Sequence, residues 1–170
     1  TTLEALAALK TPFRPQGRVT AGNAAGLNDG ATAALLASES KAKELGLSPK
    51  ARLITFAFAG VEPEIMGYGP VPSTLKALDK AGLKIEDIGL FEINEAFASV
   101  AMRYMKDLDI DHAVTNVNGG SIAMGHPLGA TGAMLVSTML DELERRQLKR
   151  AMLSLCVGGG MGISCLIERV

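Results

Sequence analysis

The chain has 170 residues, of which 48% are hydrophobic and 21% are charged, a composition that excludes a disordered protein and allows one buried core. Its 17 basic and 18 acidic residues give a formal net charge of -1, so neither nucleic acid nor an anionic membrane is expected as a partner. No apolar run approaches the ~20 residues of a transmembrane helix, and the chain opens at Thr1 without a signal-peptide pattern or initiator methionine, as expected of a piece excised from a longer protein.

The two cysteines, Cys156 and Cys165, argue against a disulfide framework. Neither has a second cysteine or a histidine at metal-ligand spacing. We therefore predict a cytoplasmic protein without a bound metal.

Local composition predicts a loop, a helix and a strand in the first third of the chain. Residues 12–30 are polar and rich in turn residues, which predicts an ordered loop. By propensity alone, the small apolar residues 31–37 predict a helix that continues through residues 38–45 and stops at Gly46. The β-branched and aromatic residues of 52–59 predict a buried strand.

The middle of the chain alternates helices with strands. A helix is expected over residues 73–81, with Ser73 as its N-cap and Gly82 at its end. A short apolar strand over 89–93 precedes an amphipathic helix that begins near Ala96.

The last third predicts a strand over 113–117, a glycine-rich stretch over 119–132, a helix, and two strands over 151–157 and 163–167 joined by glycines. The charged face of that helix is expected to consist of Asp141, Glu142, Glu144, Arg145 and Arg146. Strands that alternate with helices and end in a hairpin indicate an α/β layer with a mixed sheet.

His126 has an unusual setting, between glycines, followed by a proline and just before a helix. Such a ring is presented to a cleft and its backbone can approach a ligand, although a structural turn histidine is the alternative. His112, beside two aspartates on a polar turn, is expected at the surface.

Two further candidates lie at strand ends. Cys156 ends a predicted strand and runs into three glycines whose amides could bind an oxyanion, although cysteine in an apolar strand is often plain core, as we expect for Cys165. Asn94 lies between a strand and a helix, where an N-cap explains it equally well. Together with His126, these two residues favour acyl-transfer chemistry over metal or phosphate chemistry.

Five segments of the chain resemble the thiolase family, and they occur in order over nearly its whole length. They are residues 18–23 (RVTAGN), 66–70 (MGYGP), 94–98 (NEAFA), 118–129 (NGG through GHPLG) and 156–160 (CVGGG). The resemblance implies two similar halves, each a five-stranded sheet with helices, stacked around shared central helices.

In that arrangement the chain is an α/β thiolase-like half, with a layered, mixed five-stranded sheet and helices on both faces. Residues 1–38 would be the tail of the loop region and the last strand of a missing amino-terminal half, and residues 39–170 the carboxy-terminal half-domain. The resemblance thus makes residues 31–37 a strand, against their helical propensity.

The resemblance also implies a role for each matching residue. His126 would take the proton of a nucleophilic cysteine and then help to bind the thioester oxygen, while Asn94 would hold a water at that oxygen. Cys156 would be the acid/base for the acetyl methyl group, and the amide of Gly158 would face the second oxyanion. Substrate contacts would come from Ala24, Ala25, Met66 and Phe97.

Two departures from the family are visible. No residue matches the nucleophilic cysteine, which lies in the family's first half, so the chain alone is expected to be inactive. Ala25 stands where many relatives have a serine that binds the pantetheine arm, a contact worth about 1 kcal/mol.

The expected function is therefore that of an acyl-CoA thiolase, an acyltransferase that cleaves 3-oxoacyl-CoA or joins acetyl-CoA units through a cysteinyl thioester. Coenzyme A and its thioesters would be substrates, with no further cofactor. The partners would be the missing half and further copies in a homodimer or homotetramer. The last glycines of the histidine motif favour the degradative type of fatty acid β-oxidation. The alternatives are a non-catalytic thiolase-like lipid-binding or scaffold protein, and a ketoacyl synthase, which would show two active-site histidines.

Overall fold

The computed structural model describes residues 1–170 and contains one four-stranded mixed sheet with strand order β1-β4-β3-β2. The strands are β1 (Ala51–Gly60), β2 (Leu90–Ile93), β3 (Arg150–Val157) and β4 (Met161–Arg169). β2 pairs with β3 in parallel, and β4 is antiparallel to both β3 and β1. β1, β2 and β3 therefore run in the same direction, and their carboxyl ends lie along the same border of the sheet, which is called the carboxyl edge below.

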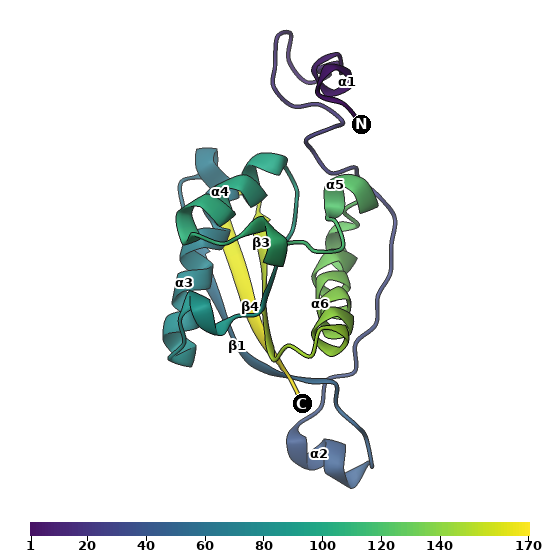
Figure 1. Cartoon of the computed structure of the whole chain (residues 1–170), viewed down its shortest axis with the longest axis vertical. Helices are drawn as coiled ribbons and strands as arrows, with labels where there is room; N and C mark the ends of the chain where they lie inside the picture. Colours follow the sequence, from purple (N-terminus) through teal and green to yellow (C-terminus); the bar gives the residue numbers. More distant parts are fainter.

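Helices cover both faces of the sheet, as Figure 1 shows. α3 (Pro70–Ala81) and α4 (Ala98–Leu108) lie on one face, and α6 (Leu128–Arg145) lies on the other. The shorter helices are α1 (Leu3–Ala7), α2 (Glu39–Glu44), α5 (Ser121–Met124) and the 3-10 helices η1 (Pro63–Tyr68), η2 (Ile85–Asp87) and η3 (His112–Val114). None of these helices is long and apolar enough to cross a membrane.

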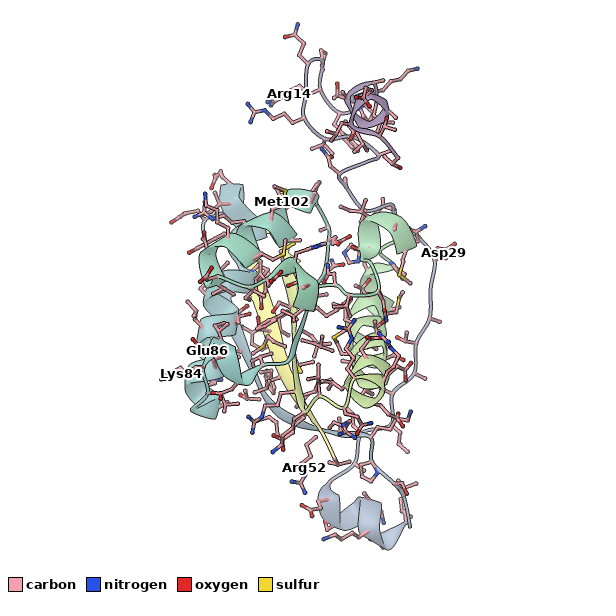
Figure 2. All side chains as sticks on the ribbon, viewed as in Figure 1. Arg14, Asp29, Arg52, Lys84, Glu86 and Met102 are labelled. Carbon is pink, nitrogen blue, oxygen red and sulfur yellow. The ribbon has the colours of Figure 1, made fainter.

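Two hydrophobic clusters hold the layers together. The first, between the sheet and α3 and α4, includes Phe91, Ile93 and Tyr104, and the second, under α6, includes Leu90 and Met139. Alternate residues of β2 thus point to opposite clusters, as strand geometry requires. Figure 2 shows the side chains that fill the space between the sheet and α6, while Arg14 stands on a loop that projects from this body.

The expected fifth strand over residues 113–117 does not form, so the prediction of five strands is wrong, although the mixed sheet with helices on both faces is confirmed. Thr115 makes only an isolated parallel bridge to Phe91. Asn116 then adopts a left-handed backbone, with φ 47°. Its side-chain amide, instead of a backbone ladder, pairs with the nitrogen and oxygen of Ile93 at 2.8 and 2.9 Å.

The strand β1 is also less buried than predicted. It lies at the edge of the sheet, and Phe56 and Phe58 are 48% and 58% exposed. Its unpaired carbonyls are partly occupied, because Lys80 and Lys76 donate to the oxygens of Phe56 and Phe58, at 3.2 Å each. α6 packs against β2, β3 and β4 instead of β1.

Residues 31–37 form neither a helix nor a paired strand. The helix expected from propensity is therefore wrong. The strand implied by the family resemblance would belong to a sheet of the other half, so that prediction, and the division at residue 38, stay predictions. The helix after it does form, as α2, with Ser38 as its N-cap.

Ser73 is not an N-cap, because α3 begins at Pro70 and Ser73 lies within the helix. Its buried hydroxyl belongs to a cluster in which Thr74 binds Tyr104, Ser154 and Ser164 at distances of 2.8, 3.0 and 2.9 Å. Burial raises the pKa of Tyr104 to about 12, so its hydroxyl keeps its proton at neutral pH. The hydroxyls of the cluster satisfy one another inside the core, where an unpaired hydroxyl would be costly.

α3 reaches the sheet through a contact between two glycine backbones. A β-carbon on Gly162 would lie 2.0 Å from the carbonyl carbon of Gly69, and one on Gly69 would lie 2.5 Å from the backbone of Met161. These backbone atoms cannot rotate away as a side chain can. The start of α3 can therefore lie on β4 only because both residues lack a side chain.

We expect Gly162→Ala to lower the free energy of unfolding by about 3 kcal/mol, the upper end of the usual cost of overpacking. The measurement is urea unfolding of the 170-residue chain. Gly60→Ala is the matched control, since nothing lies within 4 Å of its added β-carbon, and it should change stability by about 1 kcal/mol or less. Equal effects of the two substitutions would contradict this account of the contact.

Candidate active site

Asn94 is placed by the sheet. It directly follows β2, and its backbone nitrogen donates to the carbonyl of Ser154 on β3 at 2.9 Å. Only 1% of Asn94 is exposed. It is not an N-cap, because the cap of α4 is Phe97. Its side chain is therefore free to point to residues from elsewhere in the chain.

His126 lies in the loop between α5 and α6, and an extended segment near the amino terminus holds its backbone. The nitrogen of His126 donates to the carbonyl of Gly26 and to Oδ1 of Asn28, at 3.2 Å each. Leu27 and His126 form an isolated parallel bridge. α6 begins two residues later, at Leu128, within the glycine-rich stretch of residues 119–132 that was expected to precede the helix.

The ring of His126 contacts the side chain of Asn94. Nε2 of His126 lies 3.2 Å from Nδ2 of Asn94, and Nδ1 lies 2.6 Å from Oγ1 of Thr131. Burial lowers the pKa of His126. At neutral pH the ring is therefore neutral, with one nitrogen free to accept a proton.

The loop that carries α5 is anchored beside Asn94. Ser121 donates to Oδ1 of Asn94 at 2.9 Å. The carboxylate of Glu95 accepts from the side chain of Asn116 at 2.9 Å and from the amide of Ile122 at 3.3 Å. A β-carbon on Gly120 would lie 2.1 Å from the carboxyl carbon of Glu95, so any larger residue would displace this carboxylate from its present position.

Cys156 lies at the same edge of the sheet, one residue before the end of β3. It is half-buried, and burial raises the pKa of its thiol, so the sulfur is protonated at neutral pH. Its side chain packs against the cluster under α3 and α4. The structure thus brings Asn94 and His126 into contact and sets Cys156 on the neighbouring strand, without a hydrogen bond from its sulfur to either residue.

Gly158 lies in the tight turn between β3 and β4, where it is exposed. The turn is held from outside, because the nitrogen of Val61 donates to the carbonyl of Gly160 at 2.8 Å. Val61 leads into η1, which contains the half-buried Met66 and packs against α4 and the sheet. Gly158 and Met66 are thus on two connected loops at the carboxyl edge.

Ala24, Ala25 and Phe97 come together where the amino-terminal segment crosses the start of α4. Ala24 and Phe97 form an antiparallel bridge, and the nitrogen of Ala25 donates to the carbonyl of Ala96 at 3.0 Å. This crossing is two residues from Gly26, which binds the backbone of His126. One short segment therefore connects these predicted substrate contacts with the histidine.

The sequence reading missed four residues that support this site: Asn28, Glu95, Ser121 and Thr131. Glu95 was visible as the neighbour of Asn94, and Thr131 as the polar residue among the glycines after His126. Their partners depend on where α5 and α6 begin, which composition did not reveal. No group of three or more His, Cys, Asp or Glu side chains is arranged to hold a metal ion.

A neutral imidazole, a buried carboxamide and a protonated thiol at one sheet edge are suited to moving protons around a carbonyl substrate. Residues 47–169 match the thiolase C-terminal domain, and residues 1–40 match the thiolase N-terminal domain. The chain belongs to the thiolase family. The family resemblance read from the sequence is confirmed.

Individual thiolases are similar over the whole chain. The acetyl-CoA acetyltransferase of Rhizobium meliloti is 52% identical over 169 residues, which are 99% of this chain and 43% of that protein. The 3-oxoadipyl-CoA/3-oxo-5,6-dehydrosuberyl-CoA thiolase of Escherichia coli is 50% identical over 100% of this chain and 43% of its own length. The chain thus spans less than half the length of these relatives.

Solved thiolase structures have the same fold. The Bacillus anthracis acetyl-CoA acetyltransferase superposes with a TM-score of 0.94 at 50% identity, over 99% of this chain and 43% of that one. Human mitochondrial 3-ketoacyl-CoA thiolase gives a TM-score of 0.95 at 47% identity, over 100% of this chain and 43% of that one. These similarities show the fold and the family, and the roles of single residues stay predictions.

Glu92 is a buried acid next to the site of this thiolase chain. It lies on β2, is 3% exposed, and its Oε2 has no hydrogen-bond partner. Burial, followed by repulsion from Glu95 and Glu142, raises its pKa to about 8. Glu142 differs, because hydrogen bonds from Arg145, Arg146 and Asn118 lower its pKa to about 2. Its predicted place on the charged outer face is wrong, since Glu142 is 4% exposed.

The raised pKa of Glu92 predicts that Glu92→Gln stabilises the chain increasingly with pH. The unfolded state loses the proton near its ordinary pKa of 4.5, whereas the folded state keeps it up to about 8. In the wild type, ionisation therefore favours unfolding across this window, by up to about 1.4 kcal/mol per pH unit. The difference between Gln variant and wild type, measured by urea unfolding, should grow from pH 5 to 8 and then level off.

Glu168→Gln is the control, because folding shifts the pKa of Glu168 in the opposite direction to that of Glu92. A hydrogen bond from Arg150 lowers the pKa of Glu168, so the stability that this carboxylate contributes is lost below pH 4.5 instead. A stability difference for Glu92→Gln that does not vary between pH 5 and 8 would show that Glu92 is ionised in the fold.

Proposed function

We propose that this chain supplies the carboxy-terminal catalytic residues of an acyl-CoA thiolase. The reaction is thiolytic cleavage of 3-oxoacyl-CoA, or its reverse, the Claisen condensation of acetyl-CoA, through a thioester on a cysteine outside residues 1–170. The observation that carries the proposal is the 3.2 Å contact between the side chains of Asn94 and His126 at the carboxyl edge of the sheet. The relative at 52% identity is an acetyl-CoA acetyltransferase and the one at 50% identity is a 3-oxoadipyl-CoA/3-oxo-5,6-dehydrosuberyl-CoA thiolase, so both directions stay in the proposal.

In the first step, His126 acts as the base. The S–H bond of the nucleophilic cysteine breaks, the proton forms a bond with Nε2, and the thiolate attacks the 3-oxo carbonyl. The bond between this carbon and C2 then breaks, which leaves the acyl group on the cysteine and releases acetyl-CoA as its carbanion. A protonated Nε2 can no longer accept from Nδ2 of Asn94. Both groups then become donors that face the same space, which suits the oxygen of a thioester or a water bound to it.

In the second step, Cys156 exchanges the proton of the acetyl methyl group. For cleavage, its S–H bond breaks and the proton passes to the carbanion carbon released from the 3-oxoacyl chain. Coenzyme A then gives its S–H proton to the Cys156 thiolate and attacks the acyl group, and the displaced cysteine regains its proton from His126. Condensation requires the reverse, with the thiolate of Cys156 as base. The raised pKa of its thiol favours the protonated form, which is the one needed for cleavage. The amide of Gly158 would face the oxygen of the acylated cysteine.

The substrate contacts proposed are Ala24, Ala25, Met66 and Phe97. In support, Ala24 and Phe97 are bridged, and their crossing is continuous with the segment that holds His126. Ala25 offers no hydroxyl to a pantetheine arm, so one hydrogen bond of about 1 kcal/mol is absent. Assembly of the intact protein as a homodimer or homotetramer is part of the same proposal.

The proposal predicts that the 170-residue chain alone has no thiolase activity and regains it with an amino-terminal half. The test is a chimaera in which residues 1–170 replace the matching 43% of the R. meliloti acetyl-CoA acetyltransferase. Thiolysis of acetoacetyl-CoA is followed by the loss of its absorbance. Turnover by the chain alone would contradict a nucleophile outside it, and a folded but inactive chimaera would contradict the proposed function.

Separate roles for the two residues predict separate defects in the chimaera. His126→Ala should lower the rate of acylation by about 100-fold or more, since a general base contributes ~10²–10⁴-fold. Cys156→Ala should leave acylation by acetyl-CoA intact, because that reaction breaks only a C–S bond, and should block the carbon-carbon step. Acylation is measured by mass spectrometry of the trapped acyl-enzyme, and Cys165→Ala is the control thiol. Equal loss of both half-reactions in either variant would rule out this division of roles.

A further inference from the structure

Ser121 is the second partner of the Asn94 carboxamide, and it takes no part in the proton transfers proposed so far. It is the first residue of α5 and is 7% exposed. Its Oγ lies 2.9 Å from Oδ1 of Asn94, an oxygen that can only accept, so the hydroxyl is the donor. The hydroxyl makes no other hydrogen bond, so its proton is paired only at Oδ1.

The backbone around Ser121 is fixed by its neighbours. The amide of Ile122 donates to the carboxylate of Glu95 at 3.3 Å, and the carbonyl of Ser121 accepts from the nitrogen of Gly125 at 2.9 Å. Glu95 follows Asn94 in the chain, and Ile122 follows Ser121. The hydroxyl and the carboxamide that it binds are therefore held together by a second bond between the next residue of each segment.

The bond from Ser121 sets which end of the carboxamide faces the histidine. With Oδ1 turned to Ser121, Nδ2 of Asn94 faces Nε2 of His126, 3.2 Å away. Nδ2 can only donate, so Nε2 accepts and the proton of the neutral ring lies on Nδ1. Nδ1–H then donates to Oγ1 of Thr131 at 2.6 Å, and that hydroxyl donates to the carbonyl of Pro127 at 3.1 Å. Every bond from Ser121 to Pro127 therefore points in one direction.

The opposite direction would lose one hydrogen bond, at Ser121. If Nε2 of His126 carried the proton of the neutral ring, the carboxamide of Asn94 would have to turn so that Oδ1 accepts it. Nδ2 would then donate to the hydroxyl of Ser121, whose own proton would be left without an acceptor. An unpaired buried donor is unfavourable, so Ser121 favours the state in which Nε2 carries a lone pair.

We propose that Ser121 is a positioning residue that keeps Nε2 of the neutral His126 ring free of a proton, by holding the nitrogen of the Asn94 carboxamide towards the ring. After Nε2 takes the cysteine proton, the same bond keeps Oδ1 occupied, so the carboxamide does not turn to accept from the imidazolium. Nδ2 and Nε2–H then both stay available to the substrate oxygen, and Nδ1 keeps its proton throughout. The catalytic part of this inference rests on the proposed function, whereas the effect of Ser121 on the neutral ring does not.

No charged group contacts the ring, so its titration reports the orientation of the carboxamide. Asn94 and Thr131 are uncharged, and burial is the only cause that lowers the pKa of His126. The titratable groups on the surrounding segments are the buried and protonated Glu92, the bound carboxylate of Glu95, the exposed Asp29 and the protonated thiol of Cys156.

The first test is made on the 170-residue chain, by NMR of isotope-labelled histidine, which shows which ring nitrogen carries the proton. In the neutral wild-type ring of His126 the proton should lie on Nδ1, with the exposed His112 as the reference. Ser121→Ala frees the carboxamide of Asn94 to turn, so part of the population should carry the proton on Nε2. The pKa of His126 should also rise, because Oδ1 can then accept from the charged ring. Ser121→Thr keeps the hydroxyl and should behave as wild type.

Ser73→Ala is the matched control, because it removes another buried serine hydroxyl that binds neither Asn94 nor His126, and it should leave the ring unchanged. A neutral wild-type ring with its proton on Nε2 would overturn the inference, and so would an unchanged ring in a folded Ser121→Ala variant. If the Ala variant does not fold, Ser121→Cys replaces it with the same expected directions, because a thiol is only a weak donor.

The second test uses the chimaera with the R. meliloti amino-terminal part. Ser121→Ala should lower the rate of acylation by acetyl-CoA about fivefold, the effect of one hydrogen bond. The acid limb of its pH-rate profile should move to higher pH, since His126 must be neutral to act as a base. Ser121→Thr should restore both, and Ser73→Ala should not move the limb. An unchanged rate and limb in Ser121→Ala would overturn the catalytic part. If the wild-type chimaera is inactive, the proposed function fails, while the NMR measurement still decides how Ser121 affects the ring.

Discussion

The contact between Asn94 and His126 is the constraint on which the rest of the site depends, because it joins two parts of the chain that different contacts hold in place. Asn94 is held by the backbone pairing of β2 with β3, and His126 by the amino-terminal segment that includes Gly26 and Asn28. Each side chain has a second anchor, Ser121 for the amide and Thr131 for the ring. The orientation of the pair is thus set by groups other than the predicted site residues, as a preorganised site requires.

Much of the fold was predictable because it follows from periodicity. β2 and β3 are short apolar runs bounded by polar residues, and α4 and α6 bury an apolar stripe, so their approximate places could be read directly. The errors arose where side chains replace backbone pairing. The side-chain amide of Asn116 occupies the backbone nitrogen and oxygen of Ile93, where a fifth strand would have paired, and that strand does not form. Ser73 was a plausible cap by type, but its hydroxyl has buried partners on β3 and β4 that sequence does not place.

The sequence predicted the main residues of the site, as it did the main elements of the fold, but not the residues that support them. His126 stood out because glycines flank it, and Asn94 because it follows a strand. The contact of Thr131 depends instead on where α6 begins, and the position of Glu95 depends on the absence of a side chain at Gly120. Glu142 shows the same limit. Its helical position suggested a solvated face, yet two arginines and Asn118 cover it, and the neighbouring Glu92 is buried without such partners. Charge pattern alone does not distinguish these two acids.

The electrostatic character of the site follows from the absence of charge around the ring. No carboxylate binds His126, although Glu95 follows Asn94 directly in the chain, because the carboxylate of Glu95 is engaged by Asn116 and Ile122. A carboxylate on Nδ1 would stabilise the imidazolium and raise the pKa of the ring. Here the partner of Nδ1 is an uncharged hydroxyl, and burial lowers the pKa of the ring. An imidazolium formed here would therefore release its proton readily, and a residue that must be neutral again after each proton transfer gains more from this arrangement than from a tightly held charge.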